Sequence, residues 1–379
     1  MFRLDRAILR EVLPLALLCL LGLTFLFMTV GLFQIVNRFE VTPRVGTLLA
    51  FGPVLWQSLL PMTLPISLTF AAAMAFGRMR AEGEMLVLAA SGVPPWRAFA
   101  LLLPLGLVAG AMAFYAASEQ GPQAYARRHA LTRQALSDFV NYPPAGGREL
   151  RLSGIDLSYA DVRDGRLEQV TLVLHNKDGL LASLTARSAR IGYDRGAGEL
   201  TLNDVREPRI VCFDPATGAP GAPRFEVLGA QAPLLSPAFS AERIDNLRWK
   251  FDFGGERVEA AKALDTGGLL AQAAREKAEG GSSREAAAEV VRRVGLGFSG
   301  LLLPLLGALL AALVSHPNRL LAVGAGVIPG ALLYFPLLTA ASGLAKGGAN
   351  VWPCCALAPL VVGALSGAVL ARHTRGRWL

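Results

Sequence analysis

Side chains able to do covalent or metal chemistry are few in this sequence, and none stands in a familiar catalytic spacing. There is no GxxxxGK[ST] phosphate loop, no HExxH metal motif and no GxSxG nucleophile turn. The four cysteines form no CxxC pair. We therefore expect a chain that is not an enzyme, with no cofactor and no bound metal; if it transports a substrate against a gradient, we expect the energy to come from a partner. The scattered histidines are His129, His175, His316 and His373.

One short segment, from Gly77 to Phe99, has the residue types of a docking element. It reads GRMRAEGEMLVLAASGVPPWRAF. Two glutamates precede a short helical stretch from Met85 to Ala90, and the Ser-Gly and Pro-Pro pairs that follow end it. A short, stiff, amphipathic element of this kind suits insertion into a groove on a soluble motor domain. The alternative is a surface loop whose arginines lie on anionic headgroups.

The rest of the chain consists largely of apolar runs. Of its 379 residues, 53% are hydrophobic and 17% charged, against roughly 25% charged in average soluble proteins. Six runs without charge each reach the ~20 residues that a helix needs to cross a bilayer. Six buried helices of one soluble core are the alternative reading. The runs are Val12–Val36, Val45–Gly77, Ala98–Ser118, Val294–Val314, Leu320–Ala345 and Gly347–Ala371.

Two features inside these runs bear on helix shape and packing. The second run holds Pro53, Pro61 and Pro65, so we expect a loop or interfacial piece up to about Pro53 and a bent helix from there to Phe76. GxxxG pairs, which let helices approach closely, occur in three runs. They serve either packing within the bundle or a subunit interface. The pairs are Gly106–Gly110, Gly326–Gly330 and Gly363–Gly367.

The distribution of arginine and lysine predicts an orientation, because short cytoplasmic loops carry an excess of them. Most of these residues flank the N-terminus, the C-terminus and the 78–97 loop, whereas the opposite short loops hold only Arg38, Arg44 and Lys346. Both termini and the 78–97 loop are therefore expected in the cytoplasm and the middle region on the far side. The net charge of +8 is suited to anionic lipid. No basic stripe interleaved with aromatics points to nucleic acid.

The middle region changes to a strand pattern. From Glu149 onward, short alternating segments such as LEQVTLVLHN are separated by turn signals such as KDG. Alternation with turns at this spacing predicts an antiparallel sandwich or roll. After Phe253 the sequence predicts two amphipathic helices, broken at GGSS, that lead back to the membrane.

The segment LLPMTLPISLTFAAAMAFGRMRAEGEMLVLAASGVPPWRAF closely resembles the signature of the lipopolysaccharide-export permeases (LptF/LptG, the YjgP/YjgQ group). Three helices, a soluble domain and three further helices also match that family, and spans one and two look nearer to LptF. The residues at the matching positions of the family's coupling helix are Glu84, Val87, Ala90, Ser91 and Gly92.

This resemblance implies a fold and a set of partners. The fold is a six-helix membrane protein (3+3) with an inserted periplasmic antiparallel β-jellyroll-like domain. Residues 1–118 would form helices one to three, with a coupling helix at about 82–92, residues 119–283 the periplasmic part and its connecting helices, and residues 284–379 helices four to six. A paralogous permease would complete a heterodimer in the bacterial inner membrane. A cytoplasmic ABC ATPase dimer, periplasmic jellyroll bridge proteins and a single-span regulatory subunit would be further partners.

The implied function is extraction of lipopolysaccharide, or a similar multi-acyl lipid, from the inner membrane and its delivery to the bridge. Arg38, Arg44, Arg292 and Arg293 are our candidates for cations that hold the lipid's phosphates, with interfacial snorkelling as the alternative for each. A membrane-anchored scaffold or a mechanotransmitting ABC permease, whose periplasmic domain binds a protein, is the alternative function. The expected ATPase-coupling residues are Glu82, Glu84, Met85, Leu86, Val87, Leu88, Ala90, Ser91 and Gly92.

Overall fold

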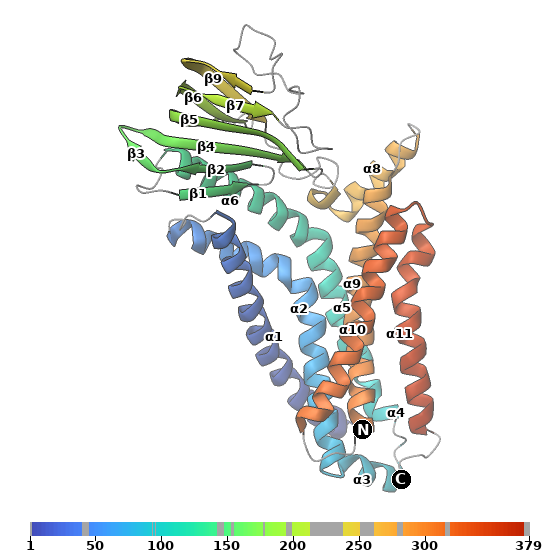
Figure 1. Cartoon of the computed structure of the whole chain (residues 1–379). Helices are drawn as coiled ribbons and strands as arrows, with labels where there is room; N and C mark the ends of the chain where they lie inside the picture. Colours follow the sequence, from blue (N-terminus) through green and yellow to red (C-terminus); the bar gives the residue numbers. More distant parts are fainter. Residues whose placement is uncertain are drawn as a thin grey trace. The chain divides into compact units, whose positions relative to one another are not determined.

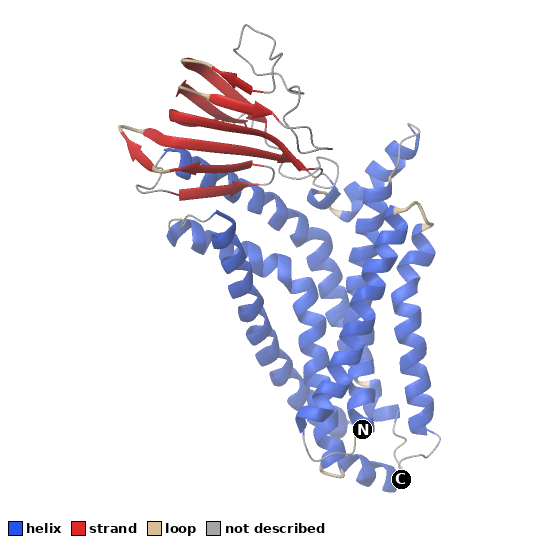
Figure 2. Cartoon of the chain, viewed as in Figure 1, coloured by secondary structure: helices blue, strands red, loops and turns tan. Residues whose placement is uncertain are grey.

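The computed structural model describes most of the chain in two compact units. The described residues are 2–39, 45–92, 94, 96–141, 148–152, 155–176, 179–194, 199–212, 238–250, 261–278, 283–314 and 319–374, with the backbone alone at the ends of several elements. The first unit comprises Met1–Thr29, Pro53–Ala126 and Arg257–Leu379, and the second comprises Val30–Gly52 and Arg127–Glu256. The second unit holds every described strand (Figure 2).

Six helical segments in the described part are long and apolar enough to cross a membrane, which confirms the six spans predicted from the sequence. The third span is compound: α5 continues through a π-helical turn, η1, into α6. The spans comprise α1 (Phe2–Phe39), α2 (Val45–Ala81), α5 (Leu102–Tyr115) with η1 (Ala116–Gln120) and α6 (Gly121–Asn141), α9 (Arg284–Leu313), α10 (Arg319–Lys346) and α11 (Val351–Thr374).

Of the two alternatives predicted for the segment before Pro53, the loop is wrong, because α2 is helical without a break from Val45 to Ala81 and contains all three prolines. The interfacial position of that segment stays a prediction. The prolines remove individual hydrogen bonds, but a loop in hydrocarbon would leave many more backbone groups unsatisfied. Hydroxyl side chains supply further local hydrogen bonds in this helix. Thr69 Oγ1, for example, donates to the carbonyl of Pro65 at 2.7 Å.

Small residues bring the helices of the first unit close together. A Cβ placed on Gly300 of α9 would lie 2.5 Å from the backbone nitrogen of Gly110 on α5. A Cβ on Gly326 of α10 would lie 2.5 Å from the carbonyl oxygen of Gly307 on α9. The GxxxG pairs of α5 and α10 therefore contain glycines that pack inside the bundle. On α11, by contrast, Gly367 has no heavy atom near its missing Cβ.

One apolar cluster gathers the short helices α3 (Glu84–Ala90) and α4 (Trp96–Ala100) with the ends of the long ones. It contains Ile8 and Val12 from α1, Met85 from α3, Phe99 from α4 and Leu309 from α9. Partly buried residues near the end of α11 pack against the same cluster. The beginning of α1, the helix α3 and the end of α11 therefore lie at one end of the helical unit (Figure 1).

Among the described residues, the second unit contains a nine-stranded antiparallel sheet. Its main path runs β1-β2-β4-β5-β6-β9, with β3 on β4, β7 on β5, and β8 on β7. The strand β5 changes partner along its length, from β7 at Ala182–Thr185 to β6 at Ser188–Asp194. The strands are β1 (Arg148–Leu152), β2 (Ile155–Tyr159), β3 (Asp161–Arg163), β4 (Arg166–Asn176), β5 (Gly179–Asp194), β6 (Glu199–Arg206), β7 (Arg209–Cys212), β8 (Ala238–Ser240) and β9 (Arg243–Lys250).

The alternation in the sequence corresponds to a buried face of this sheet. Leu157 on β2, Leu172 on β4 and Leu202 on β6 are fully buried. The residues directly before and after each of them are only partly buried. An antiparallel β-sheet inserted between the third and fourth spans is therefore confirmed.

The return from the sheet differs in one respect from the prediction. The first amphipathic segment forms α8 (Thr266–Ala278). The second is no separate helix, because it is continuous with the fourth span in α9.

Candidate functional site

The helix α3 is bounded by two glycines whose backbone is in the left-handed region. Gly83, with φ 75°, precedes it, and Gly92, with φ 77°, follows it. The turn out of α2 is closed by the amide of Glu82, which donates to the carbonyl of Arg78 at 2.9 Å. At the other end the amide of Gly92 donates to the carbonyl of Ala89 at 3.1 Å. The sequence prediction of a helix that starts after the glutamates and ends at Ser91-Gly92 is confirmed to within one residue.

The two faces of α3 differ in burial. Met85 is buried in the apolar cluster shared with α1 and α4, and Leu88 packs against it. On the outer face the side chains of Leu86 and Val87 are 59% and 69% exposed. Two large apolar side chains standing outward on a seven-residue helix form a small surface that water solvates poorly.

The glutamates beside α3 share one guanidinium group. Arg78, near the end of α2, places its Nη1 2.5 Å from Glu82 Oε2 and 3.3 Å from Glu84 Oε1. The same side chain donates from Nε and Nη2 to the two carboxylate oxygens of Glu11 on α1, at 2.5 and 2.6 Å. Glu84 is 44% exposed, so its carboxylate is still accessible to a partner.

The predicted rim arginines have different surroundings. Arg292 is about half exposed and donates two hydrogen bonds to Glu289, at 2.9 and 2.6 Å. Arg293, only 1% exposed, donates to Glu289 as well and also to the carbonyl of Leu264 at 2.8 Å. Arg44 and the side chain of Arg38 lie outside the described residues.

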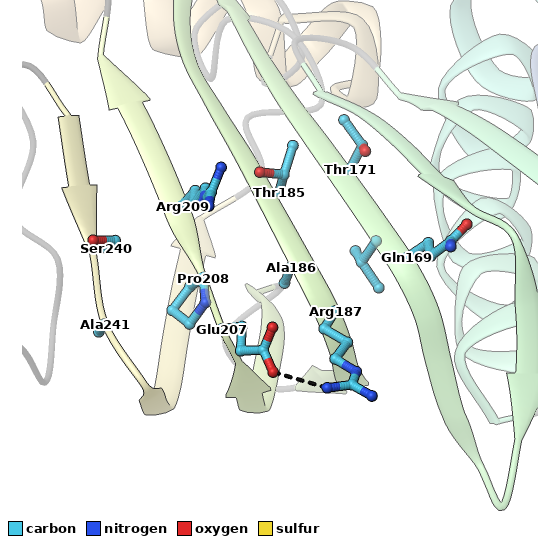
Figure 3. Close-up of a pocket in the computed structure, with 11 residues that line it drawn as sticks. Gln169, Thr171, Thr185, Ala186, Arg187, Glu207, Pro208, Arg209, Ser240 and Ala241 are labelled. Atoms are coloured by element: carbon cyan, nitrogen blue, oxygen red, sulfur yellow. Dashed lines mark hydrogen bonds and ion pairs between the residues drawn. The ribbon is translucent and has the colours of Figure 1, made fainter.

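The described surface has hollows on both the helical unit and the sheet. An apolar groove of about 320 Å³ runs between α5 and α9 and is lined by Leu107, Phe114, Phe298 and Leu301, among others. A polar hollow of about 520 Å³ lies on the sheet where β5 changes partner (Figure 3). Its rim carries the exposed ion pair between Arg187 and Glu207, at 3.0 Å. Among the described residues no three His, Cys, Asp or Glu side chains are grouped as metal ligands would be.

Sequence reasoning missed two acidic residues of this structure. Glu11 stands directly before the first charge-free run, and Glu289 stands five residues before the fourth. The signal available for Glu11 was its place at the same end of a span as Arg78. Their pairing joins residues 67 positions apart, which no local pattern reveals.

Comparison with known families gives a match over almost the whole length. Residues 6–373 match the family described as lipopolysaccharide export system permease LptF/LptG, and the match does not distinguish the two branches. The comparison with curated proteins gave no match. The six spans and the inserted antiparallel sheet agree with the architecture that the sequence resemblance implied. This chain belongs to the lipopolysaccharide export permease family LptF/LptG.

Proposed function

We propose that the chain is one of two permease subunits of an ATP-driven exporter, and that α3 is the element through which a cytoplasmic ABC ATPase dimer drives it. Membership of the permease family supplies the cargo class, lipopolysaccharide. The observation that carries the coupling role is the exposed apolar pair Leu86 and Val87 beside the accessible carboxylate of Glu84. Apolar anchors next to a charge are typical of the centre of a protein interface.

The rest of the docking surface follows from the faces of α3. Ala90, Ser91 and Gly92 are exposed together with Leu86 and Val87, and Glu82 stands exposed in the turn before the helix. Met85 and Leu88 face inward and pack α3 against the apolar cluster. A groove on the ATPase would receive the outer face, and a cation in that groove would pair with Glu84.

The distribution of arginines supports a cytoplasmic position for α3. The beginning of α1, α3 and the end of α11 lie at one end of the helical unit, and arginines concentrate at that end in the sequence. We place that end in the cytoplasm, the spans in the bacterial inner membrane, and the inserted region, residues 119–283, in the periplasm. There the sheet would pass lipid to jellyroll bridge proteins, because an open strand edge accepts a further strand.

Lipid recognition is assigned to cations at the outer rim. Of the two described candidates, Arg292 is the better placed, because its guanidinium is about half exposed and its described partner is Glu289 on the same helix. Arg38 and Arg44 remain proposals from the sequence. Arg293 would have to leave a buried set of hydrogen bonds to reach a phosphate. A paralogous permease and a single-span regulatory subunit complete the proposed assembly.

Charge reversal at Glu84 tests the coupling role. Purified from membranes in mild detergent, the wild-type chain is expected to carry a P-loop ATPase and a second permease, and Glu84→Lys is expected to lose the ATPase. The matched control is Glu242→Lys, the same charge change at an exposed position next to β9. An unchanged ATPase content in Glu84→Lys would refute docking through α3.

Mass spectrometry of the same preparations separates extraction from the alternatives. Retained lipid with several acyl chains supports an exporter. An ATPase without such lipid would instead indicate a mechanotransmitting permease, and a chain recovered with neither would indicate a scaffold.

A further inference from the structure

The guanidinium group of Arg78 has two sides, and each side serves a different part of the protein. Nε and Nη2 form a two-pronged contact with both oxygens of Glu11 on α1, at 2.5 and 2.6 Å. Nη1 faces the other way and contacts Glu82 and Glu84 at the entrance to α3. One arginine near the end of α2 therefore connects α1 to the docking element.

Over the part of α1 whose side chains are described, few residues are buried against other helices of the chain. Over the apolar window of its span only 6% of the residues are buried. Phe25 is 71% exposed and Leu18 70% exposed. In contrast, Ile8 and Val12, which flank Glu11, are buried at 3% and 0% in the apolar cluster that contains Met85 of α3. Among the residues of α1 whose side chains are described, the buried apolar ones, Ile8 and Val12, thus lie at the end near α3.

We propose that Arg78 is a positioning residue that couples α3 to α1, so that a displacement of α3 by the ATPase moves the beginning of α1. This inference rests on the function proposed above. The inference adds to that function a route for the movement, which passes through Glu11 and through the packed side chains of Ile8 and Val12 on either side of Glu11. Because few side chains in the apolar window of α1 are buried against the other helices of this chain, movement of its anchored end breaks few contacts within the chain.

The contact of Arg78 with Glu11 differs in geometry from its contact with Glu84. Arg–carboxylate pairs with two parallel hydrogen bonds are stronger and more directional than single contacts. The Glu11 contact is of that kind, whereas Glu84 makes one contact at 3.3 Å to a nitrogen that also serves Glu82. A cation of the ATPase can therefore take over Glu84 while Arg78 keeps its contacts with Glu11 on α1 and with Glu82 in the turn that leads into α3. Docking of the ATPase then uses the carboxylate of Glu84 and leaves the Glu11–Arg78 pair between α1 and α2 intact.

The test uses the assembled exporter in proteoliposomes with lipopolysaccharide, and it compares Glu11→Gln with the wild type. The variant removes the charge of the two-pronged partner and leaves Arg78, Glu82 and Glu84 in place. We expect the ATPase to copurify, ATP hydrolysis to stay within about twofold, and lipid extracted per ATP to fall about tenfold, a usual size for coupling between two sites. Glu11→Asp, which keeps the carboxylate, is expected to recover part of the extraction.

The matched control is Glu285→Gln, which removes a carboxylate from another ion pair between spans, with Lys346 Nζ at 3.5 Å. It is expected to extract lipid as the wild type does. Wild-type extraction per ATP by Glu11→Gln would overturn the proposal. Loss of the ATPase from Glu11→Gln would overturn it too, because the pair would then serve the folding of the docking surface. A wild-type complex that hydrolyses no ATP or extracts no lipid would instead refute the proposed function, and the coupling route with it.

Discussion

Arg293 and Glu289 form a buried ion pair one turn apart on α9, with Nε 2.9 Å from Oε1 and side chains that are 1% and 7% exposed. The guanidinium group also reaches Leu264 and Thr266 at the start of α8, and Ser118 in the π-helical turn η1. Thr266 in turn donates to the hydroxyl of Ser118 at 2.9 Å. One buried cation thus ties together three segments that flank the inserted region in the sequence.

Replacing Arg293 is therefore expected to destabilise the protein strongly. Arg293→Met leaves the Glu289 carboxylate and several polar groups without their buried partner, a loss of about 3–5 kcal/mol in comparable cases. Arg292→Met, at the half-exposed neighbour, should cost about 1 kcal/mol or less. Thermal unfolding of the two detergent-purified variants measures the difference. Equal melting temperatures would show that the buried arrangement contributes no more than the exposed one.

The glycines of the α5–α9 crossing are expected to tolerate no methyl group. In Gly300→Ala the new Cβ would meet the backbone of Gly110 at 2.5–2.6 Å, so one helix must move. Gly367→Ala on α11 meets no atom within 4 Å and is the control. Overpacking of this kind typically costs about 1–3 kcal/mol, which should appear as a lower melting temperature for Gly300→Ala only. The same melting temperature for both variants would contradict the close crossing.

Backbone conformation at the entrance to α3 gives a third prediction. Gly83 and Gly52 both have open space around the missing Cβ, but only Gly83 has a positive φ, 75°. Gly83→Ala should therefore strain the turn by about 1 kcal/mol, whereas Gly52→Ala, inside α2, should be neutral or slightly favourable. Hydrogen exchange of the α3 amides is expected to speed up in Gly83→Ala alone. Unchanged exchange would mean that the turn adapts without strain.

The orientation is checked by thiol labelling in a background without native cysteines. Asp245→Cys, at a side chain that is 85% exposed, is expected to react with a membrane-impermeant reagent once the outer membrane is permeable. Ser91→Cys, exposed at the end of α3, is expected to react only after the inner membrane is opened. The reverse order would place α3 in the periplasm and exclude an encounter with a cytoplasmic ATPase.

The elements could be predicted from the sequence where a local pattern was sufficient. The six spans follow from apolar runs, because a backbone in hydrocarbon must form its own hydrogen bonds. The helix from Glu84 to Ala90 follows from its flanking residues, and the strands from their alternation. The same reasoning failed at Pro53, where the local preference for a break is weaker than the requirement that backbone groups in the bilayer be paired.

What the sequence alone determined was the helical spans, the antiparallel strands, the short helix α3 and the family resemblance. Only the tertiary structure decided that Arg78 pairs with Glu11, that Arg293 is buried against Leu264, and that Gly110 meets Gly300. Each of these contacts joins residues far apart in the chain. Such pairs depend on which helices pack together and at what depth, and that is set by the shape and burial of the whole bundle rather than by any segment alone.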